Sequence, residues 1–378
     1  MDFRLSAAQE ETRARVREFA EREIRPLAPE HDVRSSFPEK LVPRMASLGL
    51  MGMTVPKEYG GTYTDTLSYV IAVEEVSRVC GGTGLFLAAH NSLGNAHIAS
   101  FASEEQKRRY LPPLASGRAI SAWGLTEPGA GSDAGATQTT AVLKGNEYIL
   151  NGSKLFITSG NLASTFVIMA STDRSRGTKG ISAFIVERGT PGFRIGGLED
   201  KLGVRASSTA ELFFENCAVP KENLIGKEGE GFRQALINLD GGRISIAAFA
   251  LGMAQGILDE CMRFLREPEG NSLARSQAVQ FALAQMAAET EAARLLVYRC
   301  ADLKDRKMPH TKESAMAKLL ASEVASRNGM TCLKLMGPAG QTRAYAVERL
   351  TRDAKLAEIG EGTSEIQKLV ISRQLGLG

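Results

Sequence analysis

The sequence has few of the features that mark membrane, disulfide-rich and metal-binding proteins. No apolar run in the 378 residues approaches the roughly 18 to 20 that a membrane-spanning helix needs, so we expect no membrane partner. The five cysteines lie far apart without a C-x-x-C pair, which excludes a disulfide framework or a zinc cluster. The four histidines show no H-x-x-x-H spacing, and we interpret His90 and His97 as packing residues and expect no metal.

An excess of charge of one sign is also absent. The chain has 46 Lys and Arg against 43 Asp and Glu, a net charge of +3, and its basic residues are scattered. A nucleic-acid partner would require a concentrated basic face, so we expect none. The N-terminal sequence mixes acids and bases on an amphipathic helix, unlike a signal peptide or an acid-poor transit peptide. We therefore expect a cytoplasmic protein.

Common nucleotide-binding and catalytic motifs are missing. The glycine-rich stretch LTEPGAGSDAG (125–135) has the spacing G-x-G-x-x-x-G, and Pro128 stands where a strand should enter a Rossmann loop. No G-x-x-x-x-G-K-[ST] loop, Ser-His-Asp set or pair of carboxylates stands out. What remains is a loop rich in backbone and hydroxyl donors, suited to the edge of a heteroaromatic cofactor or to a pyrophosphate.

Three regions differ in composition and in hydrophobic periodicity, which predicts three domains. The sequence has no internal repeats and no low-complexity linkers. Residues 1–120 show helical periodicity, residues 121–228 are rich in β-branched residues and short alternating runs, and residues 229–378 return to long helices. Within the middle region, AVLKGNEYILNGSKLFIT (141–158) predicts one hairpin and ISAFIVERGTPGFRI (181–195) another. In the last region, apolar residues recur from Val279 to Val297 and predict a buried helix of a bundle.

The stretch EIGEGTSEIQ (358–367) places Glu361 between two glycines, just before an apolar helix. Ser364 and Gln367 fit a capping box for that helix. Gly360 and Gly362 are expected to supply unusual backbone angles and to leave no bulk beside the acid. A carboxylate with such bare neighbours suits a base that approaches a carbon acid, although a solvated carboxylate beside a helix cap is the simpler interpretation.

The chain resembles the acyl-CoA dehydrogenases over its full length. The segments that carry the resemblance occur in family order: VPKEYGG (55–61), HNSLG (90–94), RYLPPLASG (109–117), AWGLTEPGAGSD (122–133), NGSKLFITSG (151–160), LDGGRISIAA (239–248), RDAK (352–355) and EIGEGTSEIQ (358–367). The resemblance implies an α+β multidomain fold with an N-terminal α-helical domain, a middle β-barrel-like domain and a C-terminal four-helix bundle. It also implies FAD as cofactor, a homotetramer built as a dimer of dimers, an electron-transferring flavoprotein as acceptor, and a place in fatty-acid or amino-acid catabolism.

The resemblance also assigns the chemistry. Glu361 is at the position of the family's base, which removes the α-proton of an acyl thioester while the β-carbon gives a hydride to the flavin. Some relatives carry the base just before the Arg of LDGGR, but this chain has Gly242 there. The thioester is that of CoA or of an acyl-carrier protein.

Further roles follow position by position from the resemblance. The residues expected to bind FAD are Trp123, Leu125, Thr126, Gly131, Ser132, Phe156, Thr158, Arg266, Gln277, Lys334, Gly337, Thr363 and Glu365. Those expected to bind substrate are Ser132, Asp240, Arg243, Gly360 and Gly362. For Asp240 and Arg243 the alternative is an exposed ion pair on a helix.

Two segments depart from the family pattern at the contact with a neighbouring subunit's FAD. The R-x-x-F-G segment reads REPEG (266–270), and the Q-x-x-G-G segment reads KLMGPAG (334–340). Glu269 near a pyrophosphate is unfavourable unless it is paired, and we expect Lys334 to neutralise it.

Alternatives remain for both activity and substrate. The same fold could use oxygen, as monooxygenases and nitroalkane oxidases do, or the chain could have lost FAD and act only as a binding partner. Family members for straight chains usually have Tyr before the base, whereas this chain has Gly360. The volume freed at Gly360 and Gly242 favours a branched or cyclic acyl group, unless a side chain such as Leu93 or Phe249 fills it.

Overall fold

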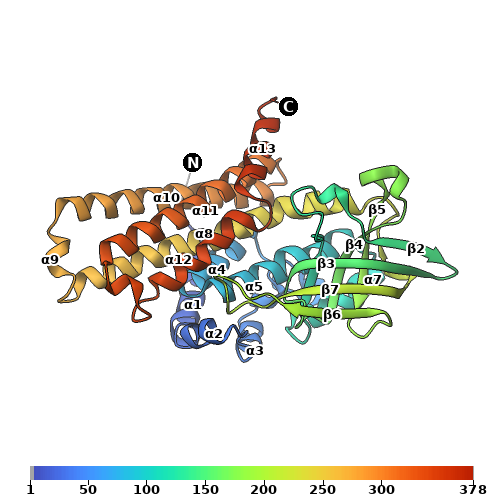
Figure 1. Cartoon of the computed structure of the whole chain (residues 1–378), viewed down its shortest axis with the longest axis horizontal. Helices are drawn as coiled ribbons and strands as arrows, with labels where there is room; N and C mark the ends of the chain where they lie inside the picture. Colours follow the sequence, from blue (N-terminus) through green and yellow to red (C-terminus); the bar gives the residue numbers. More distant parts are fainter. Residues whose placement is uncertain (1–3, 378) are drawn as a thin grey trace.

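The structure is a computed structural model that describes residues 4–377. Figure 1 shows an elongated molecule with a long helical bundle at one end and a twisted sheet at the other. The first helices run along one side and connect the two. The predicted order of α, then β, then α is confirmed, as is the fold class.

The N-terminal region is helical. Ser6 caps the first helix and Ser103 the last, each in a capping box with a glutamine three residues on. The described elements are α1 (Ala7–Phe19), η1 (Ala20–Ile24), α2 (Ala28–Arg34), α3 (Leu41–Ser47), η2 (Leu50–Gly52), η3 (Lys57–Tyr59), α4 (Thr66–Val79), α5 (Gly81–Ala89), η4 (His90–Asn95), α6 (Ala96–Phe101) and α7 (Glu104–Ala115). The segment η4 is a π-helix, a form often found at functional sites.

The middle region forms one mixed sheet in the order β6-β7-β3-β2-β4-β5-β8, with β1 pairing in parallel with β4. Its strands are β1 (Ser121–Gly124), β2 (Thr140–Lys144), β3 (Glu147–Thr158), β4 (Thr165–Ser171), β5 (Ile181–Glu187), β6 (Phe193–Leu198), β7 (Thr209–Pro220) and β8 (Leu224–Ile225). The short 3-10 segments η5 (Ala134–Ala136), η6 (Arg174–Gly180) and η7 (Lys221–Asn223) connect them. The hairpin predicted over residues 141–158 is the antiparallel pair β2–β3.

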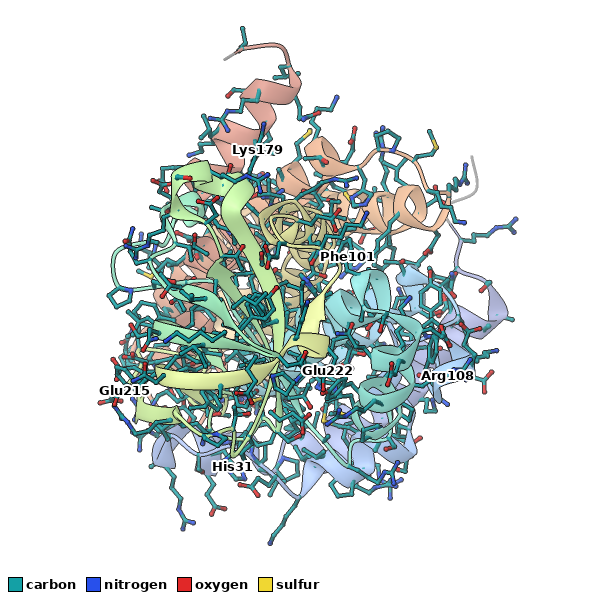
Figure 2. All side chains as sticks on the ribbon, turned by 90° about the vertical axis from the view of Figure 1, so that its right-hand side faces the viewer. His31, Phe101, Arg108, Lys179, Glu215 and Glu222 are labelled. Carbon is teal, nitrogen blue, oxygen red and sulfur yellow. The ribbon has the colours of Figure 1, made fainter. Side chains whose placement is uncertain are left out.

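The second predicted hairpin is wrong. Strands β5 and β6 follow each other in the chain but lie apart in the sheet, because β5 pairs with β4 and β8 while β6 pairs with β7. Figure 2, which looks onto the sheet end, shows Arg108 of α7 beside the sheet and Glu222 of η7 in front of it. The side-chain amide of Gln106 in α7 donates to the carbonyl oxygens of Glu222 (2.7 Å) and Leu224 (2.9 Å), which fixes helix to sheet.

The C-terminal bundle is built around one central helix. Its elements are α8 (Gly231–Arg266), α9 (Asn271–Ala274), α10 (Gln277–Asp305), α11 (Thr311–Met336), η8 (Ala339–Gln341), α12 (Val347–Ile359) and α13 (Ser364–Gln374). Helix α8 contacts α4, α5, α10, α11 and α12. In α10, Val279, Met286 and Val297 are buried, as the apolar periodicity predicts.

The expectation that no segment is apolar and long enough to span a membrane is wrong for α8. By length and composition this helix passes such a test, yet most of its apolar stretch is buried inside the fold. A Cβ atom at Gly252 would lie 2.3 Å from the carbonyl oxygen of Glu74, and one at Gly256 would lie 2.1 Å from that of Arg78. Helix α4 therefore packs directly against the backbone of α8 at these two glycines. The apolar stretch of α8 is a part of the protein core.

Candidate functional site

Glu361 lies in the turn between α12 and α13 and has an unusual backbone conformation. Its φ angle is +53°, in the left-handed region that residues other than glycine rarely adopt. Gly362 follows with a φ of +94°, as expected, but Gly360 has an ordinary φ of −66°. The prediction of unusual angles at Gly360 is therefore wrong, and the strained residue is the acid itself.

Two buried side chains hold this turn by its carbonyl oxygens. The ammonium of Lys318 in α11 donates to the carbonyl oxygen of Gly362 at 2.6 Å. The side-chain amide of Gln367 donates to the same oxygen at 2.9 Å and to that of Glu361 at 3.3 Å. Because both anchors are fully buried, they fix the direction in which the Glu361 side chain leaves the turn.

The predicted capping box of Ser364 and Gln367 is therefore wrong. Gln367 is engaged with the turn, and the cap of α13 is Thr363, whose hydroxyl accepts from the backbone amide of Ile366 at 3.3 Å. Thr363 thus has a structural role of its own. Glu365 is exposed in the first turn of α13.

The carboxylate of Glu361 reaches the surface of α8 at Gly242. A Cβ atom at position 242 would lie 2.3 Å from Oε2 of Glu361 and 3.3 Å from Cδ2 of Leu93. Oε2 is buried and has no hydrogen-bond partner. The absence of a side chain at Gly242 makes room for the Glu361 carboxylate, so our expectation that it enlarges the substrate space is wrong.

The electrostatic surroundings of Glu361 suit a general base. Burial raises the pKa of Glu361 to about 7, although the positive charges of Lys318 and Arg243 oppose this rise. A carboxylate with such a pKa is partly ionised at neutral pH and is a stronger base than a solvated one. A catalytic base works best when its pKa is near the working pH.

Asp240 and Arg243 flank the same stretch of α8 and are not an exposed ion pair. Nη1 of Arg243 lies 2.5 Å from Oδ1 of Asp240, and only 6% of Arg243 is exposed. The hydroxyl of Thr311 donates to Oδ2 of Asp240 at 2.7 Å. Nε of Arg243 is buried without a partner, so a donor remains for a polar group of a ligand.

On the sheet side, Trp123 of β1 is held by a chain of buried hydrogen bonds. Its indole N–H donates to Nδ1 of His97 at 3.3 Å, and Nε2 of His97 lies 3.2 Å from Oε1 of Gln234. Burial lowers the pKa of His97 to about 4, so the ring is neutral and carries its proton on Nε2. His90 is likewise buried and hydrogen-bonded, and residues 4–377 contain no group of three potential metal ligands. Both histidine rings are thus hydrogen-bonded within the fold, as their predicted packing roles require.

The glycine-rich loop is anchored by a buried ion pair that connects it to β3. Nζ of Lys154 lies 2.6 Å from Oε1 of Glu127, with 0% and 4% of the two side chains exposed. Glu127 also accepts from the backbone amides of Gln138 (2.6 Å) and Thr139 (3.0 Å). Its charge is therefore compensated inside the protein and does not oppose an anionic cofactor.

The exposed face of this loop fits a planar cofactor with phosphates. Leu125 is buried, Trp123 and Thr126 are half-buried, and Gly131 and Ser132 are exposed. A Cβ at Gly131 would have no neighbour within 4 Å, so its backbone is open to a ligand. The loop presents hydroxyl and backbone groups and no uncompensated carboxylate apart from the exposed Asp133, as FAD requires.

Phe156 supports the same fit. It is 59% exposed and has a φ of +58°, at an irregularity between Lys154 and Ile157 where β3 slips against β7. Backbone strain that turns an aromatic ring towards solvent gives no folding benefit and is typical of a ring that packs on a ligand. Thr158, half-buried, ends the same strand.

Four predicted FAD residues lie elsewhere. Arg266 ends α8, Gln277 begins α10, and Lys334 and Gly337 lie at the end of α11. Figure 1 shows these helix ends at the end of the bundle remote from the sheet, so within one chain they do not meet the glycine-rich loop. Lys334 and Glu269 are both exposed, and no ion pair joins them among residues 4–377. The expected neutralisation therefore does not occur within the chain.

The sequence did not single out Lys318 or the pair of Glu127 and Lys154, and it indicated a capping role for Gln367 where the structure shows an anchor of the turn. A signal existed for Lys154, which interrupts the alternation of β3 at an inward-facing position, and for Lys318, a lone charge within the apolar stretch SAMAKLLAS. Neither could be assigned a partner, because both partners lie far away in the chain.

Comparisons with known proteins agree with this geometry. Residues 6–118, 122–217 and 229–376 match in order the N-terminal, middle and C-terminal domains described for acyl-CoA dehydrogenases. A curated relative from Clostridium acetobutylicum, "Acyl-CoA dehydrogenase, short-chain specific", is 54% identical over 377 residues, covering 99% of this chain and 100% of the relative.

Two solved structures are similar throughout. Butyryl-CoA dehydrogenase from Megasphaera elsdenii is 41% identical with a TM-score of 0.96, covering 99% of this chain and 100% of that one. A chain in the structure described as "Electron transferring flavoprotein of Acidaminococcus fermentans: Towards a mechanism of flavin-based electron bifurcation" is 50% identical with a TM-score of 0.97, covering 99% of each chain.

Proposed function

Since this chain belongs to the acyl-CoA dehydrogenase family, we propose that it oxidises the Cα–Cβ bond of a short, straight acyl-CoA to the trans-2-enoyl thioester. As a family member it is an FAD-dependent oxidoreductase. The observation that carries the proposal is the partnerless, buried Oε2 of Glu361, on a carboxyl whose pKa is raised to about 7.

Each part of the site has a task in this reaction. Glu361 takes the α-proton on its carboxylate, and its buried anchors keep that carboxylate aimed at one point. Arg243 and Asp240 bind polar groups of the thioester arm. When bound, FAD supplies the acceptor for the hydride that leaves the β-carbon. The residues that would hold it are Trp123, Leu125, Thr126, Gly131, Ser132, Phe156 and Thr158. Closure of the site by substrate removes water from Glu361 and strengthens it as a base.

The acyl group is proposed from two observations. Position 242 offers no extra volume, because the Glu361 carboxylate and Leu93 occupy it. The relative at 54% identity is described as specific for short chains, and a neighbour at 41% identity as a butyryl-CoA dehydrogenase. These favour a short straight chain over the branched or cyclic group suggested by Gly360. Position 360 itself is open, since a Cβ there would meet only Leu356, at 3.5 Å and beyond.

The partners are proposed on the same basis. The structure that shares 50% identity is described together with an electron transferring flavoprotein, which supports such a protein as the acceptor here. Four predicted FAD residues lie far from the glycine-rich loop of their own chain, namely Arg266, Gln277, Lys334 and Gly337. Their position supports a contact with the FAD of a neighbouring subunit in a homotetramer. We also take residues 1–120, 121–228 and 229–378 as the three domains.

The test is an anaerobic titration of the purified holoprotein. The flavin absorbance should bleach with butyryl-CoA faster than with octanoyl-, isobutyryl- or cyclohexanecarbonyl-CoA. The contrast should be large, because one methylene in an apolar pocket changes selectivity by roughly 10- to 200-fold. A colourless protein would support the non-catalytic alternative, and fast reoxidation of the bleached flavin by air would support the oxygen-using one. Preference for a branched or cyclic thioester would overturn the proposed substrate.

A further inference from the structure

Lys318 is a charged residue in a fully buried place. None of its surface is exposed, and it lies on the face of α11 that packs against the turn of Glu361. Its ammonium donates to the carbonyl oxygen of Gly362, and no carboxylate in residues 4–377 forms an ion pair with it. A buried ammonium without a direct counter-ion is costly, and burial lowers the pKa of Lys318 to about 8. Stability alone would favour an apolar side chain here.

The charged groups around Lys318 come from every neighbouring element. Helix α8 contributes Arg243, and the turn contributes Glu361. Glu358 of α12 and Glu365 of α13 have a weaker electrostatic effect on Lys318. Glu358 is paired with Lys355 at 2.6 Å, and Glu365 is exposed to solvent. Tyr69 of α4 also faces Glu361, but its buried phenol donates to the carbonyl oxygen of Ala88 at 3.0 Å and stays neutral. Glu361 is thus the acid that the charge of Lys318 most affects.

We propose that Lys318 is the positioning residue of the catalytic base: it fixes the left-handed turn through the Gly362 carbonyl, and its buried charge favours the ionised form of Glu361. The inference rests on the proposed function of Glu361. The bond to the carbonyl oxygen has a specific advantage. A direct salt bridge would occupy Oε2 and weaken the base. An ammonium bonded to the carbonyl oxygen of the next residue, Gly362, favours the ionised carboxylate and leaves Oε2 free.

Three substitutions separate the two tasks. Lys318→Gln keeps a donor for Gly362 but removes the charge, Lys318→Met removes both, and Lys318→Arg keeps the charge. Lys144→Gln, at the exposed end of β2, controls for the loss of one positive charge. The measurement is the rate of anaerobic flavin bleaching by butyryl-CoA between pH 5.5 and 9.5, per bound flavin.

We expect the apparent pKa of the bleaching rate to rise from about 7 by about one unit or more in the Gln and Met variants, which means a rate at pH 7 that is lower by roughly fivefold or more. At pH 9 the Gln variant should recover to within about threefold of wild type, and the Met variant less, because its turn is no longer anchored. The Arg variant and Lys144→Gln should keep the wild-type pKa.

An unchanged pKa in Lys318→Gln would overturn the proposal, as would a loss that is equal at every pH. A lower yield of folded protein does not affect this test, because the apparent pKa does not depend on the amount of protein. If the Met variant loses its flavin, the pH profiles of the Gln and Arg variants still test the proposal. Failure of butyryl-CoA, octanoyl-CoA and the branched thioesters to bleach the wild-type flavin would instead contradict the proposed function.

Discussion

A Cβ atom at Gly242 would lie 2.3 Å from Oε2 of Glu361, a distance at which one of the two must move. The residues are 119 positions apart in sequence and meet where α8 passes the turn between α12 and α13. The backbone of α8 at Gly242 thus forms part of the space that the Glu361 carboxylate occupies. This relationship explains why the chain keeps a glycine in the middle of its central helix, where Ala would favour the helix by about 0.5–1 kcal/mol.

Gly242→Ala should therefore impair activity without harming the fold. The new methyl group displaces the carboxylate, and a misplacement of about 1 Å can cost roughly 10²-fold in rate. Gly241→Ala is the matched control, because its Cβ would meet only the flexible end of Lys304, at 2.9 Å. Bleaching rates and flavin content of both variants are the measurement. Equal rates in the two variants would show that Glu361 does not work from its position in this structure.

Gly360 should accept a side chain. Its φ of −66° is open to any residue, and a Cβ would have its nearest neighbour at 3.5 Å. Gly360→Ala should fold and bind flavin as the wild type does. Gly360→Tyr should reduce kcat/KM for branched and cyclic thioesters more than for butyryl-CoA, because the ring fills space beside the base. An equal loss on all substrates would indicate that position 360 does not border the acyl group.

Breaking the buried pair of Glu127 and Lys154 should release the flavin loop. Lys154→Met leaves a buried carboxylate with only its backbone donors, and loss of one partner of such a pair costs about 3–5 kcal/mol. We expect a lower melting temperature and easier loss of FAD, both partly restored in Lys154→Met/Glu127→Gln. Arg22→Met, which breaks an exposed pair with Glu18, should cost less than about 1 kcal/mol. A double variant no better than Lys154→Met would contradict this role.

The raised pKa of Glu361 has a consequence for stability. The folded value of about 7 lies above the ordinary value of 4.5, so the folded chain holds this proton more tightly than the unfolded chain. The group therefore contributes stability below about pH 4.5 that is lost as the pH rises through about 7. At pH 8 the buried, ionised carboxylate opposes folding.

Glu361→Gln should accordingly stabilise the flavin-free protein at pH 8 by about 1–3 kcal/mol, and by much less at pH 5. Chemical unfolding at the two pH values measures this difference. The control is Glu365→Gln, which changes an exposed acid four residues away and should have no such pH-dependent effect. A variant less stable than wild type at pH 8 would show that the Glu361 carboxylate is satisfied in the folded chain.

The sequence was sufficient for the order of the three regions and for the β2–β3 hairpin, because both depend on local patterns. The assignment of Glu361 as the base came from the family resemblance and stays a prediction. It was insufficient where distant segments meet. The pairing of β5 with β8 rather than β6 follows from sheet order, which short alternating runs do not encode. Gln367 looked like half of a capping box until its side chain proved to hold the turn. The apolar stretch of α8 has the composition of a membrane span, and only its neighbours show that it is core.

The most direct test of the account is the rate at which butyryl-CoA bleaches the flavin of Glu361→Gln under anaerobic conditions. Gln has nearly the same shape as Glu but cannot accept the α-proton, and a general base typically contributes about 10²- to 10⁴-fold. We predict that the variant retains its fold and its bound flavin but bleaches at least 100-fold more slowly than wild type. Bleaching at close to the wild-type rate would contradict the assignment of Glu361 as the base.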